Sequence, residues 1–194
     1  MVGIARGFIT SGSSHPHRPT MPAVPADTVN VVLSEELLGQ KQSDRPGVQR
    51  GFTWEEVKQI VAAERLDLLG RVTEKELAYR EDMQKICEEY GSVVAYIQQV
   101  KLGDFIRDTV SELLMIPNDY PYSLPDNTLH YIVWSKIKLT PGTVPDAAVR
   151  QFFEGRLDKE IGTGKYEWVW FVNPPHLQSI PEVIHGHLIL QKLE

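Results

Sequence analysis

Apolar residues recur at helical spacing in the segment that begins near Phe52. Its apolar positions are Val57, Ile60, Val61, Leu66 and Leu69. Residues spaced by three and four positions share one face of an α-helix, so the segment predicts a helix with one buried face. Thr53 and Glu56 form a capping box at its start, and Gly70 is a typical stop signal.

The same periodicity predicts two further helices. Thr73 and Glu76 repeat the capping-box pattern and open a second apolar stripe, which continues beyond Gly91. A third helix is predicted over Phe105–Met115, because Pro117 disfavours helical backbone just before it. The chain from residue 52 to residue 115 is therefore predicted to be helical.

The pattern changes to that of β-strands in the last third of the chain. Residues 129–136, 167–172 and 183–190 are rich in β-branched and aromatic side chains and are predicted strands. A short helix is predicted within residues 145–153. Helices followed by a set of strands predict the α+β class, with an N-terminal helical segment packed on a mostly antiparallel C-terminal sheet.

The first 47 residues differ in composition from the rest. Residues 11–22 are dense in Ser, Pro and Gly, which offer little apolar surface to offset the entropy of ordering. We predict a disordered or loosely docked tail over residues 1–47, with residues 29–38 as a short strand or helix that docks. Residues 48–194 are predicted to form a single α+β domain.

Charge and composition exclude several classes of function. The net charge is −6 and no run of Lys or Arg occurs, so we expect neither nucleic acid nor an anionic membrane surface as a partner. No apolar stretch approaches the roughly 18–20 residues that span a bilayer. One cysteine, Cys87, cannot form an internal disulfide. We expect a cytoplasmic location, extending to the nucleus.

Histidines on two of the predicted strands are the strongest candidates for chemistry. His185 and His187 lie two residues apart, so strand alternation puts both imidazoles on one side, about 7 Å apart. His130 and Lys136 share one face of another strand. Three imidazoles suit a divalent metal or joint action on a phosphate, with Lys136 as an anion partner. The alternative is a polar sheet face that binds only water and neighbouring side chains.

Two loops offer further contacts to a ligand. Asn118 and Asp119 lie in a polar turn between two prolines, and Asn173 and Ser179 lie in the loop that leads to the last strand. Amide, carboxylate and hydroxyl groups at these places could contact a ligand or orient a histidine. The alternative role of all four residues is turn formation.

Several of these segments, in this order, resemble a known family. They are residues 118–122 (NDYPY), 130–136 (HYIVWSK), 170–174 (WFVNP), 177–180 (LQSI) and 185–187 (HGH). Over residues 50–194 the chain resembles the N-acetylglucosamine-induced protein family, a mainly fungal group built on a domain of unknown function. The resemblance implies an intracellular fungal protein linked to the response to an amino sugar, and it implies no catalytic activity.

A looser resemblance concerns mechanism. The H-x-H strand and its preceding loop are similar to the histidine-triad and hexose-1-phosphate uridylyltransferase superfamily. That resemblance implies His187 as the nucleophile, with Asn173 and Ser179 as phosphate or orienting contacts. The chain departs from the pattern in having Leu188-Ile189 after His187 and a longer gap between Ser179 and His185.

These observations leave several functions open. The first is a histidine-lined pocket for a small molecule, such as a sugar phosphate or nucleotide, in amino-sugar or sugar-nucleotide metabolism. Its enzymatic form uses His187, His185 and His130 in phosphoryl or nucleotidyl transfer, and its metal form uses the same three as ligands. The second is a non-catalytic module that senses a ligand or contacts another protein. Whether the chain is an enzyme, and its oligomeric state, are not decided by the sequence.

Overall fold

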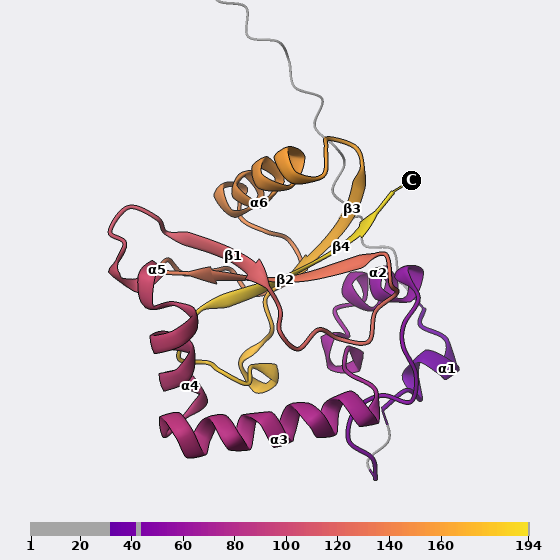
Figure 1. The fold of residues 1–194 in the computed structure, drawn as a ribbon. Helices are drawn as coiled ribbons and strands as arrows, with labels where there is room; N and C mark the ends of the chain where they lie inside the picture. Colours follow the sequence, from indigo (N-terminus) through magenta and orange to yellow (C-terminus); the bar gives the residue numbers. More distant parts are fainter. Residues whose placement is uncertain (1–31, 42–43, 194) are drawn as a thin grey trace, which may run out of the picture.

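A four-stranded antiparallel sheet forms the centre of the computed structural model, which describes residues 32–41 and 44–193 (Figure 1). The order across the sheet is β1-β2-β4-β3. The strands are β1 (Leu113–Pro117), β2 (Thr128–Ser135), β3 (Tyr166–Phe171) and β4 (His185–Lys192). Every neighbouring pair is antiparallel. The predicted α+β class is confirmed, as are strands in the three predicted segments.

Helix α6 (Ala147–Glu160) covers one face of this sheet. Its buried side chains pack against apolar side chains of the two central strands and of β3; the buried members of this cluster from α6, β3 and β4 include Val149, Phe153, Leu157, Trp170, Leu188 and Leu190. The sequence predicts only a short helix here, within residues 145–153. The observed helix is longer because apolar positions continue to Leu157. Its buried face and the sheet together enclose a hydrophobic core cluster on this side of the sheet.

The N-terminal helical half covers the other face in two groups. Helix α2 (Trp54–Ala62) and the 3₁₀ turn η1 (Leu66–Leu68) pack over β3, against Val169 and Phe171. At the other end of the sheet, η2 (Ile97–Lys101, a π-helical turn) and α5 (Gly103–Arg107) pack on Ile132 and Trp134 of β2. The sheet surface between the two groups carries the histidines.

Helix α3 (Thr73–Tyr90) joins the two groups and crosses the gap between them (Figure 1). All 18 of its residues are at least partly exposed. It ends at Gly91, whose φ of 80° lies in the left-handed region, and α4 (Val93–Tyr96) follows. Because α3 stands away from the sheet, it leaves room for a cavity beneath it.

Two sequence predictions about the helices are wrong. The helix predicted over Phe105–Met115 ends at Arg107, and the chain then forms β1. The Asp108 side chain accepts hydrogen bonds from the backbone of Val110 and Ser111, which stops the helix. The apolar run that follows, Leu113–Pro117, then pairs with β2 instead of continuing the helix.

The second wrong prediction concerns helix termini. Thr53 and Glu56 do form the predicted capping box of α2. At α3, however, the N-cap is Val72, without a side-chain hydrogen bond. The carboxylate of Glu76 instead forms ion pairs with arginine side chains. Helix α2 also ends at Ala62 rather than near Gly70, because η1 intervenes.

A short helix, α1 (Glu35–Leu38), docks beside α2. Leu37 is fully buried in the same cluster as Val48, and Val48 forms a β-bridge with Val72. Residues 1–31, the larger part of the predicted tail, lie outside the described residues, and the boundary at residue 47 stays a prediction. In the described part of the chain no helix is both long and apolar enough to cross a membrane.

Candidate functional site

The pairing of β2 with β4 brings the three predicted histidines together. In this register Ile132 faces His187 and Trp134 faces His185. Nε2 of His130 lies 3.0 Å from Nδ1 of His187, and the ring centroids of His185 and His187 are 5.5 Å apart. All three side chains are buried, with at most 9% of each residue exposed. They form one cluster on the face that the N-terminal helices cover.

Hydrogen bonds around His130 determine which ring nitrogen carries its proton. The backbone N–H of Tyr122 lies 3.4 Å from His130 Nδ1 and can only donate. The side-chain Nδ2 of Asn118 lies at the same distance from His130 Nδ1. The Asn118 amide is oriented with this nitrogen toward the histidine because its Oδ1 accepts a hydrogen bond from the backbone N–H of Tyr120. Nδ1 is therefore an acceptor, and neutral His130 carries its proton on Nε2.

This tautomer determines that of His187. Nε2–H of His130 donates to Nδ1 of His187, so neutral His187 carries its own proton on Nε2. The side-chain Nδ2 of Asn173 lies 3.3 Å from that nitrogen. Two donors cannot pair, so the Asn173 amide accepts this proton through its oxygen, after the half-turn that exchanges its two similar ends. Both ring nitrogens of His187 are then engaged by the protein.

His185 is bonded differently from the other two histidines. Its Nδ1 lies 2.7 Å from the backbone carbonyl oxygen of Val183, which can only accept. Neutral His185 therefore carries its proton on Nδ1. Within residues 32–41 and 44–193 its Nε2 has no hydrogen-bond partner. This arrangement leaves the lone pair of Nε2 available.

Burial keeps all three imidazoles neutral. It lowers the pKa of His130 to about 3, with a further contribution from the positive charge of Arg71. Burial, followed by the neighbouring His130, His185 and Arg71, holds the pKa of His187 well below 6.5. Burial also lowers the pKa of His185, against the opposing effect of its bond to Val183.

Aromatic rings hold the His187 imidazole in place. Phe171 stacks on it with a centroid distance of 4.8 Å and an interplanar angle of 11°, and Tyr122 stacks at 5.9 Å and 16°. Tyr122 also contacts His130, at 4.9 Å. Burial raises the pKa of the Tyr122 hydroxyl, so this ring stays neutral. His130 and His187 are therefore fixed by packing as well as by hydrogen bonds.

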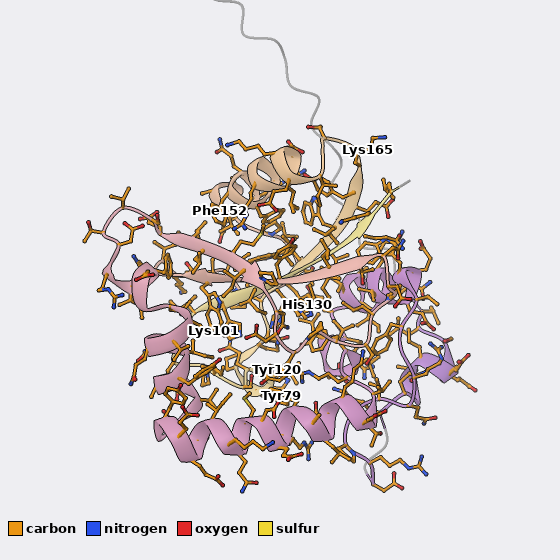
Figure 2. The ribbon with its side chains drawn as sticks, in the orientation of Figure 1. Tyr79, Lys101, Tyr120, His130, Phe152 and Lys165 are labelled. Atoms are coloured by element: carbon orange, nitrogen blue, oxygen red, sulfur yellow. The ribbon has the colours of Figure 1, made fainter. Side chains whose placement is uncertain are left out.

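A cavity of about 110 Å³ lies between this sheet face and the segment from α3 to η2. His185 and His187 contribute to its wall from the sheet, and Tyr79 and Tyr96 contribute from the helical side. His130 is not part of the wall; it lies behind His187. A volume of this order holds several water molecules or one small organic molecule. Figure 2 shows Tyr79, Lys101, Tyr120 and His130 between the sheet and α3.

Two cations at the cavity each have a carboxylate partner. Arg71 lies over the Tyr79 ring at 4.0 Å and is 3.1 Å from Glu76. Its Nε donates to the backbone oxygen of Tyr120 at 3.0 Å. Lys101 pairs with Asp119 at 2.6 Å, which raises the pKa of the lysine. The charged groups at the cavity are thus nearly balanced.

Most of the loop residues predicted from the sequence lie at this site. Asn118, Asp119 and Ser179 belong to the cavity wall, and Asn173 is buried beside His187. Lys136 does not reach it. This lysine is exposed, its Nζ donates to the backbone oxygen of Asp108, and it lies 4.4 Å from the centre of the Phe105 ring.

Sequence reasoning missed the side chains that reach the cavity from the helical half. Tyr79, Tyr96 and Lys101 come from α3, α4 and η2, and Arg71 lies between η1 and α3. Tyr120 lies in the turn whose asparagine and aspartate were predicted as ligand contacts, so that motif was the one available signal.

Metal binding by the three histidines stays a prediction. In the described part of the chain, no group of three or more His, Cys, Asp or Glu residues is arranged to hold a metal ion. Nε2 of His130 and Nδ1 of His187 are hydrogen-bonded to each other, and the other ring nitrogens of these two histidines also have protein partners. This leaves one lone pair, on Nε2 of His185, to bind a metal.

Two curated fungal proteins are similar in sequence to this chain. An uncharacterized protein of Saccharomyces cerevisiae, YPL067C, is 26% identical over 175 residues, which covers 81% of this chain and 86% of that protein. The N-acetylglucosamine-induced protein 1 of Candida albicans is 22% identical over 176 residues, covering 74% of this chain and 69% of that protein. The predicted resemblance to the N-acetylglucosamine-induced proteins is confirmed.

The fold and the family also have matches. The crystal structure of HTC1 superimposes with a TM-score of 0.53 at 27% identity, over 73% of this chain and 85% of that one. The family described as "Protein of unknown function (DUF3605)" matches residues 53–191. This range includes β1, β2 and β3, all of β4 except its last residue, and every histidine of the cluster.

Proposed function

Because the chain belongs to the family of proteins of unknown function DUF3605, we propose a function from the cavity itself: it binds a small, hydroxyl-rich molecule of sugar size. The cavity between the sheet and α3 carries this proposal. Its wall combines tyrosine rings with histidine, asparagine and serine side chains. Small-molecule sites combine a largely apolar wall with a few polar groups that orient the ligand.

The proposed ligand belongs to amino-sugar or sugar-nucleotide metabolism. Tyrosine rings such as Tyr79 and Tyr120 offer flat apolar surfaces, to which the C–H faces of a pyranose ring are complementary. Asn118 and Ser179 offer hydrogen bonds to its hydroxyls. The name of the Candida relative, N-acetylglucosamine-induced protein 1, supports the choice of an amino sugar.

Binding without catalysis is the form that the hydrogen bonds favour over transfer through His187. A nucleophilic imidazole needs a free lone pair, and His187 has Nδ1 bonded to His130 and Nε2 bonded to Asn173. A histidine-triad type of nucleotidyl transfer through His187 would require this chain of hydrogen bonds to break first. A sensor or an enzyme of another type uses the cavity as it stands.

Titration calorimetry with N-acetylglucosamine, its 6-phosphate and its uridine diphosphate derivative tests the proposal. Ser179→Trp fills the cavity wall and is expected to abolish the binding seen with the wild type. Ser111→Trp is the matched control, because Ser111 is exposed and outside the wall. Absence of binding for all three compounds, or equal binding by both variants, would refute the proposal.

A turnover assay separates the catalytic form from the binding form. The uridine diphosphate sugar is incubated with the wild type and with His187→Ala, and the products are followed by chromatography. Turnover that is lost in the variant would support transfer through His187. Turnover that is equal in both proteins, or absent from both while the sugar binds, contradicts that role.

A further inference from the structure

The three histidines of the cluster differ in one respect that decides which of them meets a ligand. His130 and His187 form a continuous hydrogen-bonded chain from Tyr122 to Asn173. Each ring nitrogen in that chain already has a protein partner. His185 belongs to the same cluster but stands outside the chain.

We propose that His185 is the ligand-binding histidine of the cavity, and that its Nε2 accepts a hydrogen bond from a hydroxyl or amide N–H group of the ligand. This inference rests on the proposed function, because it assigns the contact within the same cavity. It differs from the sequence resemblance, which implies the second histidine of the H-G-H motif as the active one. The structure assigns the first.

The bond from Nδ1 fixes the acceptor role of Nε2. The Val183 carbonyl lies 2.7 Å from Nδ1 and holds the proton there. A neutral imidazole has one donor and one acceptor nitrogen, so Nε2 is the acceptor. A backbone carbonyl at the other nitrogen is the usual way in which proteins orient a histidine toward a ligand.

The side chain of His185 lines the cavity, and its Nε2 is not sealed in the core. Among the described residues, the unpartnered side-chain nitrogens that are fully enclosed belong to Trp134 and Trp170. Nε2 of His185 has no partner there and is not one of these enclosed atoms, and its side chain lies in the cavity wall. A ligand donor can therefore reach this nitrogen without displacing a protein group.

The surroundings hold the ring in this orientation. Trp134 lies beside it with a ring-centroid distance of 5.1 Å, and this tryptophan is its register partner on β2. On the other side the His187 ring lies edge-on at 5.5 Å and is itself fixed by the hydrogen-bonded chain. The chain from His130 to Asn173 therefore positions His187, and His187 in turn supports His185.

The acceptor role restricts the chemistry of the ligand. Phosphate oxygens are acceptors, and an acceptor nitrogen gives them no hydrogen bond. A sugar hydroxyl or the N–H of an acetamido group supplies the missing donor. The part of the ligand at His185 is therefore the hydroxyl or amide end of the molecule, and any phosphate lies elsewhere.

Long-range ¹H–¹⁵N NMR of the ligand-free protein tests the assignment directly. We expect an unprotonated Nε2 in His185, and protonated Nε2 atoms in His130 and His187. Addition of N-acetylglucosamine should move the Nε2 resonance of His185 furthest among these three. A protonated Nε2 in His185, or an unprotonated one in His187, would overturn the inference whether or not the sugar binds.

Chemical modification and one variant complete the test. Diethyl pyrocarbonate reacts with neutral imidazoles that have an accessible lone pair, so His185 should react before His130 and His187, with exposed His176 as the positive control. Reaction at His187 first would contradict the proposal. His185→Phe should weaken sugar binding about tenfold or more, as expected for one lost hydrogen bond, whereas His176→Phe should not. Failure of calorimetric binding in the wild type would refute the proposed function and leave the tautomer test intact.

Discussion

Gly186 separates the two histidines of the H-G-H motif, and replacing it with alanine should be strongly destabilising. Gly186 lies on the face of the sheet that α6 covers, opposite to the face that carries the histidines. A Cβ atom at this position would lie 2.2 Å from Cη2 and 2.5 Å from Cζ2 of Trp170. Trp170 is 1% exposed and stacks on Phe153 at 5.8 Å, so the indole has no free space into which it can move.

The size of the effect follows from this overlap. Normal contacts of a Cβ atom lie between 3.4 and 4 Å, so the indole or the strand must shift by more than 1 Å. Overpacking of a core costs about 1–3 kcal/mol, and a rigid ring that is almost fully buried belongs at the upper end. A cost of about 3 kcal/mol lowers the melting temperature by roughly 6–12 °C for a chain of this length.

Urea unfolding followed by tryptophan fluorescence measures the change in the free energy of unfolding. Trp170→Phe removes the three ring atoms that clash, so Gly186→Ala should cost at least 1 kcal/mol less in that background. Gly155→Ala in α6 is the control: its Cβ would meet nothing within 4 Å, and alanine is the better helix former. A cost for Gly186→Ala below about 0.5 kcal/mol, or an equal cost in both backgrounds, would refute the steric argument.

Three further outcomes are expected. Burial lowers the pKa of His130 and His187, so the unfolded chain binds more protons than the folded chain below about pH 6.5. The contribution of the two histidines to the free energy of unfolding is fully present above that pH. As the pH falls below it, the free energy of unfolding decreases by up to about 1.4 kcal/mol per pH unit for each histidine. Urea unfolding from pH 7.5 to 5 measures this slope, and His130→Gln should reduce it; an unchanged slope would count against the buried neutral histidines. Leu37→Ala should cost about 2–5 kcal/mol, because Leu37 is fully buried, whereas Leu38→Ala, at 42% exposed, should cost less than 1; equal costs would show that α1 does not dock as described. Lys136→Met should leave sugar affinity unchanged, because Lys136 lies outside the cavity wall; a large loss in calorimetry would return it to the site.

Local patterns determined the class of fold and one face of the site. Strand alternation by itself places His185 and His187 on one side, and the structure confirms that these residues lie on a strand. The ordered motifs were sufficient to identify the family. These features depend on neighbours in sequence, so the sequence alone reveals them.

The error over Phe105–Met115 has a physical cause. A short apolar run such as Leu113–Pro117 fits a helical or an extended pattern equally well. Pairing with β2 decided between them, because each residue of β1 gains a partner well beyond its local neighbours, from Leu113 with Ser135 to Pro117 with Tyr131. Such a contact leaves no local signal.

The sequence by itself determined which residues lie on the same face of each strand. Tertiary structure decided which faces meet. It placed His187 within hydrogen-bonding distance of His130 and Asn173 and left Nε2 of His185 without a protein partner. It also brought Arg71, Tyr79 and Lys101 over the sheet. The reason is that side-chain direction is a property of a few adjacent residues, whereas the hydrogen bond between His130 and His187 joins two strands whose histidines lie 57 positions apart in the sequence.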